Sequence, residues 1–390
     1  MKKYLLIVII TLLYSQEVRF IDEIFDEVSV TENIVYGNAP DLPFIFLFEW
    51  NTNDIDLHMD LYQPVGDTMD DRPVIIFSHS GAFFTGSKNA QDMVALCEAA
   101  AKRGYVAISM EYRLGLNILS SYSGERAVYR GVQDGSAIIR YLREYHDNFN
   151  IDYEKIFFWG SSAGSFIGLH LSYIEESERP ISTYGTDSDP DLGCFDCEGN
   201  NYIHSSKPAA LISTWGAISD LEYIDEYEYV PTALFHGTSD IIVRYDEGFP
   251  FTLNITLPYV YGSLKVSDRM TELGINNLLV IEDSEPHEYY GTTNGNFLFG
   301  GGPNEYWNLI LDEAFNFLYN QLNIQGDVNN DGSINIQDVV ILLNYILSSE
   351  DPNPYQFDIS DINNDGVLNV LDVILLVELI TYLVQLNDFS

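Results

Sequence analysis

Residues 155–165, Lys-Ile-Phe-Phe-Trp-Gly-Ser-Ser-Ala-Gly-Ser, constrain the fold of this chain more than any other stretch. The β-branched and aromatic run 156–159 predicts a buried strand, and the apolar pattern 166–171 predicts a helix soon after it. Between them, Gly-x-Ser-x-Gly predicts a tight turn, which is the setting that a nucleophilic serine requires. Ser162 is therefore a candidate nucleophile. A glycine-rich turn with no catalytic role fits the same pattern, so the choice between the two interpretations depends on the rest of the chain.

A serine hydroxyl becomes a good nucleophile only when a histidine accepts its proton, and that histidine needs a carboxylate to fix its orientation. When the serine lies on a turn of this kind, the acid and then the histidine follow it along the chain. Asp240 follows the apolar run 232–235, and His287, the one histidine beyond Asp240, follows the run 278–281. We therefore predict that Ser162, Asp240 and His287 form a catalytic triad.

Other titratable residues are weaker candidates for these roles. Glu282, Asp283 and Glu285 are alternatives to Asp240, but they lie beside His287 in sequence, which makes good side-chain geometry difficult. His79 comes too early and is expected to shape its own small-residue loop, and His236 is expected to hydrogen-bond the backbone around it. The remaining histidines are expected to be surface or structural residues: His58, His146, His170 and His204.

Strand and helix patterns alternate along most of the chain. Buried strands are predicted at 74–77, 105–110, 156–159, 210–215, 232–235 and 278–281, and helices at 90–103, 130–144 and 305–322. This alternation predicts an α/β fold, a doubly wound and mostly parallel sheet with helices on both faces. Ligands bind at the carboxyl ends of the strands in such a sheet, and the candidate residues follow strands at that edge.

The segment 176–207 interrupts the alternation and is rich in Ser, Asp, Gly and Pro, so we expect an insertion over the active-site face. It contains Cys194 and Cys197, for which a local disulfide is the favoured interpretation. A metal site would need two more ligands, and only His204 and scattered acids are near. A redox role lacks the thioredoxin-like pattern. Cys97 is expected to be a buried helix residue.

Together these features resemble the α/β-hydrolase superfamily, in particular its secreted carboxylesterase and hormone-sensitive-lipase-like branch. The resemblance covers residues 33–322. His-Ser-Gly-Ala-Phe at 79–83 is similar to the family's His-Gly-Gly-Gly-Phe loop, Glu-Tyr-Arg-Leu at 111–114 resembles its Asp-Tyr-Arg-Leu, and Gln-Asp-Gly-Ser-Ala at 133–137 precedes the serine as in relatives. Two glycines of the oxyanion loop are replaced, by Ser80 and Ala82.

The resemblance implies a role for each matched residue. Ser162 would be the nucleophile, Asp240 the orienting acid and His287 the general base and acid. The oxyanion hole would consist of the amide of Ala163 together with that of Gly81 or Ala82. The reaction would be acyl transfer to Ser162 followed by hydrolysis of the acyl-enzyme, with no metal or organic cofactor required for catalysis.

The N-terminus and the overall charge bear on location and partners. Met-Lys-Lys followed by the apolar run 4–13 predicts a signal peptide, residues 1–15, that is too short to anchor the chain in a membrane. We expect an exported protein, secreted or associated with the cell surface, with no membrane span. The chain has 18 basic and 59 acidic residues, so nucleic acid and anionic membranes would be repelled.

The composition changes after residue 324, since 325–390 contain eleven acids and no Lys, Arg or His. An internal repeat lies here: Asp-Val-Asn-Asn-Asp-Gly-Ser-Ile-Asn-Ile-Gln-Asp at 327–338 and Asp-Ile-Asn-Asn-Asp-Gly-Val-Leu-Asn-Val-Leu-Asp at 361–372. Each copy precedes an apolar helical pattern, at 339–347 and 373–383, and has no clear helix before it. We expect the apolar faces of these two helices to form a mutual core.

Oxygen-bearing side chains occupy positions 1, 3, 5, 9 and 12 of each copy, with glycine at position 6 for the sharp turn. This is the EF-hand spacing for calcium, with a backbone carbonyl at position 7 and Asp in place of Glu at position 12. The sequence therefore predicts two Ca²⁺ sites. The ligands are Asp327, Asn329, Asp331, Ser333, Asn335 and Asp338 in the first loop, and Asp361, Asn363, Asp365, Val367, Asn369 and Asp372 in the second.

This repeat resembles a type I dockerin, over residues 325–386. The resemblance implies a domain that folds around calcium and docks onto a cohesin-type protein. The positions that usually contact cohesin are Ile336 with Gln337 and Val370 with Leu371 in this chain. The family commonly has hydroxyl side chains at these positions, whereas neither of these pairs contains one.

The sequence thus predicts three parts: a signal peptide at 1–15, an α/β-hydrolase catalytic domain at 16–323 and a dockerin domain at 324–390. The favoured function is a secreted serine carboxylesterase acting on carboxylic esters. Acetyl or feruloyl groups on plant or algal polysaccharides are the suggested substrates, by association with the dockerin alone. A peptidase or short-chain lipase on the same triad is an alternative, as is a non-catalytic binding protein carried by the dockerin.

Overall fold

The computed structural model describes residues 18–387, except 43–48, 51, 118–119, 121, 188, 228, 253–256, 323–324, 330–333, 350 and 364. The predicted signal peptide, residues 1–15, lies outside the described residues. None of the described helices is both long enough and apolar enough to cross a membrane.

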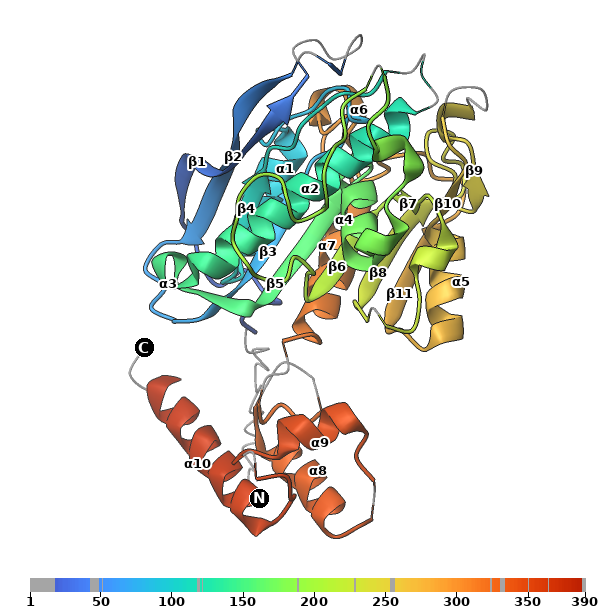
Figure 1. The fold of residues 1–390 in the computed structure, drawn as a ribbon. Helices are drawn as coiled ribbons and strands as arrows, with labels where there is room; N and C mark the ends of the chain where they lie inside the picture. The colour runs from blue at the N-terminus through green and yellow to red at the C-terminus, as the bar shows by residue number, and fades with distance from the viewer. Residues whose placement is uncertain are drawn as a thin grey trace, which may run out of the picture.

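An eight-stranded sheet forms the centre of the molecule, with the order β1-β2-β4-β3-β5-β6-β8-β11 (Figure 1). The strands are β1 (Val28–Asp41), β2 (Asn53–Pro64), β3 (Arg72–Ser78), β4 (Val106–Met110), β5 (Ile151–Ser161), β6 (Ala210–Thr214), β8 (Thr232–Gly237) and β11 (Asn277–Glu282). β2 pairs antiparallel with β1 and β4, and every other pairing in this sheet is parallel. This is the α/β-hydrolase arrangement that the sequence predicted.

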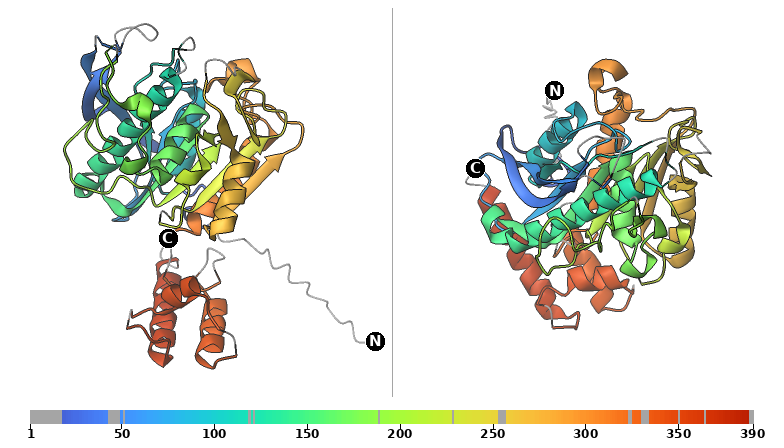
Figure 2. Two further views of the ribbon diagram at one scale, coloured as in Figure 1. Left: turned by 45° about the vertical axis from the view of Figure 1, so that its right-hand side comes forward. Right: turned by 45° about the horizontal axis from the view of Figure 1, so that its top comes forward.

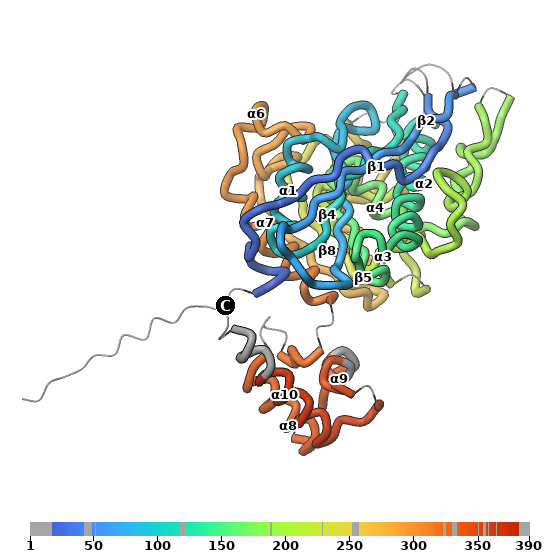
Figure 3. Tube along the Cα trace, turned by 90° about the vertical axis from the view of Figure 1, so that its left-hand side faces the viewer, coloured from blue at the N-terminus to red at the C-terminus, as the bar shows by residue number. Residues whose placement is uncertain are grey.

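Alternate residues of the central strands pack into two hydrophobic cores, one on each face of the sheet. In β5, Ile156 and Phe158 face one core, and Phe157 and Trp159 face the other. The first core includes helices α2 (Ser123–Glu144), α4 (Ala163–Tyr173) and α5 (Ser263–Leu273). The second core includes α1 (Gln91–Lys102) and α7 (Glu305–Tyr319), and these two helices lie on the same side of the molecule (Figure 3). Burial on both faces explains why these strands read as continuous apolar runs.

Smaller elements complete this part of the molecule. They are α3 (His146–Phe149), α6 (Phe297–Gly300) and a second sheet of β7 (Ala217–Ile218), β10 (Val260–Gly262) and β9 (Glu247–Gly248), with short 3₁₀ turns η1 (Glu176–Glu178), η2 (Ile181–Thr183), η3 (Leu221–Tyr223) and η4 (Pro250–Thr252). The inserted segment 176–207 is mostly irregular and packs on α2. The predicted disulfide Cys194–Cys197 is present, and Cys97 is buried in α1, as expected.

Three further helices, α8 (Ile336–Ile346), α9 (Pro354–Ser360) and α10 (Val370–Asn387), pack together apart from the sheet (Figure 2). α9 precedes the second acidic loop, so the expectation of no preceding helix is wrong for that copy. Asn353 caps α9 by accepting a hydrogen bond from the amide of Gln356, and Pro354 occupies its first position. Proline is well tolerated there because the first amide of a helix needs no partner.

The expected mutual core of these helices is only partly correct. Val339, Leu342 and Leu376 are buried together in a small core. A second set of apolar residues is exposed to solvent instead: Ile336, Val340 and Leu343 on α8, Leu347 just after it, and Val370, Ile374 and Val377 on α10. Each helix therefore has an apolar stripe wider than the small core can cover.

Candidate active site

Ser162 occupies the sharp turn between β5 and α4, and its backbone is held at φ 50° and ψ −110°. A non-glycine residue rarely adopts such a positive φ, and a strained nucleophile turn of this kind presents the hydroxyl at the end of the strand. Gly160 and Gly164 make the turn sterically feasible. A Cβ atom on Gly160 would lie 2.2 Å from the carbonyl oxygen of Gly164, and one on Gly164 would lie 2.1 Å from that of Ser78.

The structure brings the three predicted catalytic residues together. The His287 Nε2 atom lies 2.9 Å from the Ser162 Oγ atom, and the His287 Nδ1 atom lies 2.6 Å from Asp240 Oδ2. Asp240 follows β8, and His287 follows β11, which pairs with β8 in parallel. Three distant segments therefore meet at one edge of the sheet, since parallel strands place their carboxyl ends together.

Asp240 is held as a carboxylate by its surroundings. Its Oδ1 atom accepts hydrogen bonds from the amides of Ile242 and Val243, at 2.8 and 2.9 Å. Burial alone would raise the pKa of Asp240, but hydrogen bonds from His236 and His287 outweigh this effect and hold its pKa well below its usual range. A carboxylate that keeps its charge can orient His287 and stabilise the imidazolium form when His287 takes a proton.

His236 contacts Asp240 directly, which the sequence interpretation missed. Its Nε2 atom lies 2.9 Å from the carbonyl oxygen of Val243, the backbone contact that was expected, and also 3.1 Å from Asp240 Oδ2. Its Nδ1 atom lies 2.8 Å from Ser263 Oγ. Because both neighbours of Nε2 are acceptors, this nitrogen carries the proton. The place of His236 near the end of β8, four residues before the acid, was a signal for this contact.

Two of the three alternative acids form hydrogen bonds with residues other than His287. Asp283 accepts a hydrogen bond from Thr238, and Glu285 accepts one from Tyr306. For Glu282 the described structure gives no contact with His287. Asp240 is therefore the carboxylate that the geometry places on His287.

Two of the three predicted oxyanion residues, Ala82 and Ala163, lie at the same cavity as Ser162. Gly81 has φ 122° and Ala82 has φ 55°, so the loop turns through left-handed conformations even where alanine replaces glycine. Ala163 is the first residue of α4, and amides in the first turn of a helix have no partner within it. These amides are thus available as donors toward a ligand oxygen.

His79 and Lys88 anchor the two ends of this loop. The His79 ring is buried, stacks on Tyr112 at 4.1 Å, and has its pKa lowered to about 4 by burial, so it is uncharged at neutral pH. The Lys88 ammonium group contacts both oxygens of the buried Asp60, at 2.8 and 2.7 Å. The Lys88–Asp60 pair joins residues 28 apart in sequence, and no local pattern indicated it.

The cavity beside Ser162 is almost wholly apolar. Most of its walls come from α2, α4, the oxyanion loop and the loops after β8 and η4. The apolar side chains that line it include Phe83, Leu116, Val128, Tyr129, Val132, Phe166, Ile174, Phe195, Ile242, Phe251, Leu257 and Val260. Glu125 and His170 also reach it. An apolar cavity with a few polar groups at the reacting end is typical of a small-molecule site.

The second predicted calcium loop is described apart from residue 364, whereas Asp331 and Ser333 of the first loop lie outside the described residues. Asp338 and Asp372 occupy equivalent places: each accepts the amides of the residues nine and three positions before it. Gly366 has φ 79°, as position 6 requires. Among the described residues, no group of three or more acidic, histidine or cysteine side chains lies close enough together to form a metal site.

The donor set nevertheless fits a hard cation. Four of the predicted ligands are buried aspartates, Asp327, Asp338, Asp361 and Asp372. No basic residue exists between 325 and 390 to neutralise them. Buried charges are costly unless they are paired or coordinate a metal, and carboxylate, amide and carbonyl oxygens are the ligands that calcium prefers.

Comparison with known families separates the same two parts of the chain. The family model described as BD-FAE matches residues 59–207, and the model of the dockerin type I domain matches residues 325–381. The first match includes Ser162 and ends before Asp240. Both matches confirm the resemblances that were expected from the sequence, and the calcium-type loops belong to the dockerin match.

Curated relatives and solved structures are also similar to the first part. The chain is 28% identical over 255 residues to carboxylesterase 3B of Mus musculus, covering 58% of this chain and 43% of that protein, and 32% identical over 126 residues to carboxylesterase 3 of Homo sapiens, covering 31% and 22%. The chain thus spans less than half the length of these relatives. A propionate-bound esterase structure from Thermogutta terrifontis is 20% identical, with a TM-score of 0.49 over 74% of this chain and 93% of that one.

Proposed function

We propose that this chain, which combines an α/β-hydrolase domain of esterase type with a C-terminal type I dockerin domain, is a serine carboxylesterase. The observation that carries the proposal is the continuous hydrogen-bonded series Ser162–His287–Asp240, which ends in an oxygen exposed to an apolar cavity. Serine, histidine and carboxylate in this order of contact are the groups that acyl transfer requires.

The geometry supports a two-step reaction. His287 Nε2 takes the proton from Ser162 Oγ as that oxygen attacks the ester carbonyl carbon, while Asp240 holds the proton on Nδ1. The carbonyl oxygen, now negative, accepts hydrogen bonds from the amide of Ala163 and from that of Gly81 or Ala82. Each such donor is worth about 3 kcal/mol of barrier. His287 then returns the proton to the leaving alcohol, and a water molecule repeats the cycle on the acyl-enzyme.

The cavity favours an apolar acyl group, and the dockerin suggests where the alcohol part belongs. An apolar wall suits an alkyl or aryl acyl group, whereas a sugar hydroxyl is better placed toward solvent. We propose esters on polysaccharides, such as acetyl or feruloyl groups, and an exported protein that is secreted or held at the cell surface. A cohesin-type protein is the proposed partner of the dockerin domain.

The calcium ligands are proposed as the twelve residues of the two loops. Calcium would supply positive charge to the four buried aspartates and so hold the fold of the dockerin domain. No catalytic step depends on it. The boundaries at residues 15 and 323 remain proposals.

Hydrolysis of p-nitrophenyl acetate, butyrate and octanoate tests the proposal. We expect the wild type to hydrolyse the short esters and to be labelled by a fluorophosphonate, and Ser162→Ala to lose both. The matched control is Ser172→Ala, a buried serine on α4 that donates to the carbonyl of Gly168. Labelling without ester hydrolysis would favour a peptidase, and the absence of both would favour a non-catalytic binding protein.

A further inference from the structure

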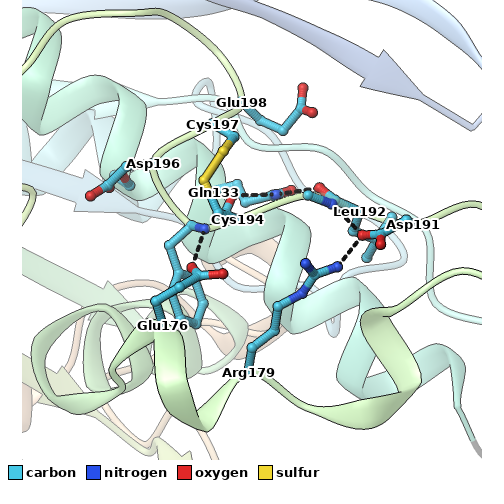
Figure 4. Close-up of a disulfide and its surroundings, with 12 residues drawn as sticks. Gln133, Glu176, Arg179, Asp191, Leu192, Cys194, Asp196, Cys197 and Glu198 are labelled. Carbon is cyan, nitrogen blue, oxygen red and sulfur yellow. Dashed lines mark hydrogen bonds and ion pairs between the residues drawn. A yellow bond between two sulfur atoms is a disulfide. The ribbon is translucent and has the colours of Figure 1, made fainter.

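The disulfide Cys194–Cys197 closes a small ring in the inserted segment (Figure 4). This segment borders the cavity of Ser162, because Phe195 lines that cavity. Phe195 lies inside this ring. Only 8% of its surface is exposed, although it belongs to an irregular loop. Its ring packs against that of Tyr129, with 4.7 Å between the ring centres. A disulfide ring of this size restricts the backbone of the two residues it encloses, Phe195 and Asp196.

α2 holds the ring through main-chain carbonyl groups. The side-chain amide nitrogen of Gln133 donates to the carbonyl oxygens of Leu192 and Cys194, at 2.6 and 3.0 Å (Figure 4). The Tyr129 hydroxyl donates to the carbonyl oxygen of Gly193 at 2.7 Å. On the other side, the amide of Phe195 donates to the Glu176 carboxylate at 2.9 Å. The position of Phe195 is thus fixed on both sides of its backbone.

Phe195 separates two cavities. The first is the apolar cavity beside Ser162, and the second is lined by Glu175, Glu176, Ser206 and Lys207 among others. Val132, Ile174 and Phe195 line both cavities, so these three side chains form their common wall. Phe195 is the largest of them. It is also the member that comes from the inserted segment and not from the core of the hydrolase fold.

We infer that Phe195 is a specificity-determining residue: it ends the acyl cavity at the common wall, limits the length of acyl group that the site accepts, and is held there by the Cys194–Cys197 disulfide. This inference rests on the proposed esterase function. An acyl group that fills the first cavity meets the Phe195 ring, and a longer one has to displace it. The second cavity would become available only when the ring is removed.

Acyl-length profiles of three variants test the inference. We expect Phe195→Ala to raise kcat/KM for p-nitrophenyl octanoate relative to the acetate by about tenfold or more, since each methylene admitted to an apolar pocket is worth about 1–3 kcal/mol. Phe195→Trp should change the same ratio in the opposite direction. The matched control is Phe166→Ala, which removes an equally buried phenylalanine (8% exposed) that lines the first cavity only. An equal rise in Phe166→Ala, or unchanged ratios in both Phe195 variants, would overturn the inference.

Binding without turnover separates this inference from the esterase proposal. In Ser162→Ala protein, calorimetry with ethyl octanoate and ethyl butyrate measures the cavity alone. We expect Phe195→Ala in this background to favour octanoate over butyrate by a similar factor, and no change in that preference would overturn the inference even if no ester is hydrolysed. The Cys194→Ser, Cys197→Ser double variant should shift the preference in the same direction by less, and a wild-type preference would exclude a role for the disulfide.

Discussion

The two parts of this chain bury acidic side chains in different ways. In the α/β-hydrolase domain, Asp134 pairs with Arg113 and Asp60 pairs with Lys88, all four side chains being buried. In the dockerin domain, four aspartates are buried in a segment without a single basic residue. Both of these acids have counter-charges within the first domain, whereas, under the proposed calcium binding, the second domain would obtain its counter-charges from solution. The stability of the first domain would then be independent of calcium, whereas that of the second would depend on it.

Removal of calcium should give the largest difference between the two domains. A ligand present at about a thousand times its Kd stabilises a fold by about 4 kcal/mol per site, so chelation should unfold α8–α10 and leave the sheet domain intact. Calorimetric melting of the full chain, with calcium and with a chelator, measures this. Two transitions of which only one moves are expected, and transitions that both stay in place would contradict the calcium dependence.

Asp372→Asn should weaken calcium binding at the second loop, whereas Asp351→Asn, an exposed acid of the same domain, serves as its control. Calcium titration calorimetry of the full chain should then show one site weakened and the other retained.

Breaking one internal pair should be the next largest effect. Asp134→Asn leaves the buried Arg113 guanidinium without its carboxylate, and we expect a loss of about 3–5 kcal/mol in the free energy of unfolding. Asp246→Asn is the control, because the Arg244–Asp246 pair is partly exposed and should be worth about 1 kcal/mol or less. Urea unfolding measures both, and equal losses would mean that burial does not decide the cost.

Asp92 sharpens the comparison, because no basic side chain pairs with this buried acid among the residues that the structure describes. Its carboxylate accepts hydrogen bonds from Tyr290 and from the amide of Met93, and Glu288 adds a like charge nearby. Burial raises its pKa from 3.8 to about 7. The folded state therefore binds the proton more tightly than the unfolded state. Its stabilising contribution is complete below pH 3.8 and is lost as the pH rises through 7.

We expect Asp92→Asn to remove a fall in stability between pH 4 and 7, on the order of 4 kcal/mol, given about 1.4 kcal/mol for each unit of the pKa shift from 3.8 to about 7. Urea unfolding of wild type and variant at several pH values provides the measurement. Curves that stay parallel across this range would show that Asp92 does not titrate there.

The smallest predicted effect concerns a hydrogen bond between the two regions. Tyr319, at the end of α7, donates a hydrogen bond of 2.8 Å to Asp327, the first residue of the first calcium loop. We expect Tyr319→Phe to weaken calcium binding at that loop by about fivefold, about 1 kcal/mol, and to leave the second loop unchanged. Tyr306→Phe, at the other end of α7, is the control. Calorimetric titration with calcium resolves the two sites, and an equal effect on both loops would exclude this specific coupling.

Much of the fold could be predicted from local sequence. Strands such as 156–159 are apolar on both faces, and this pattern indicates a parallel sheet without further information. Ser162, Asp240 and His287 could be proposed because each follows such a strand in the expected order. The Asn353 and Pro354 cap of α9 was also visible in the sequence, and its helix was nevertheless missed.

Other features depend on contacts that no local pattern encodes. The Lys88–Asp60 pair and the Phe195 wall form between segments far apart along the chain, and nothing at either position indicates the other. The apolar stripes of α8 and α10 have a helical period that fits a buried face. Their exposure follows from the small size of the domain, which has too few residues to cover both stripes.

The bonds that hold the Cys194–Cys197 ring have a consequence for how this fold can diversify. Gln133 and Tyr129 bind carbonyl oxygens of the main chain, which every residue type provides. The side chain at position 195 makes none of these hydrogen bonds, although the Phe195 ring packs against that of Tyr129. The hydrogen bonds that hold the ring can therefore stay constant while the residue at position 195 is replaced. Under the proposed function, such a replacement would change substrate preference without a change of the fold.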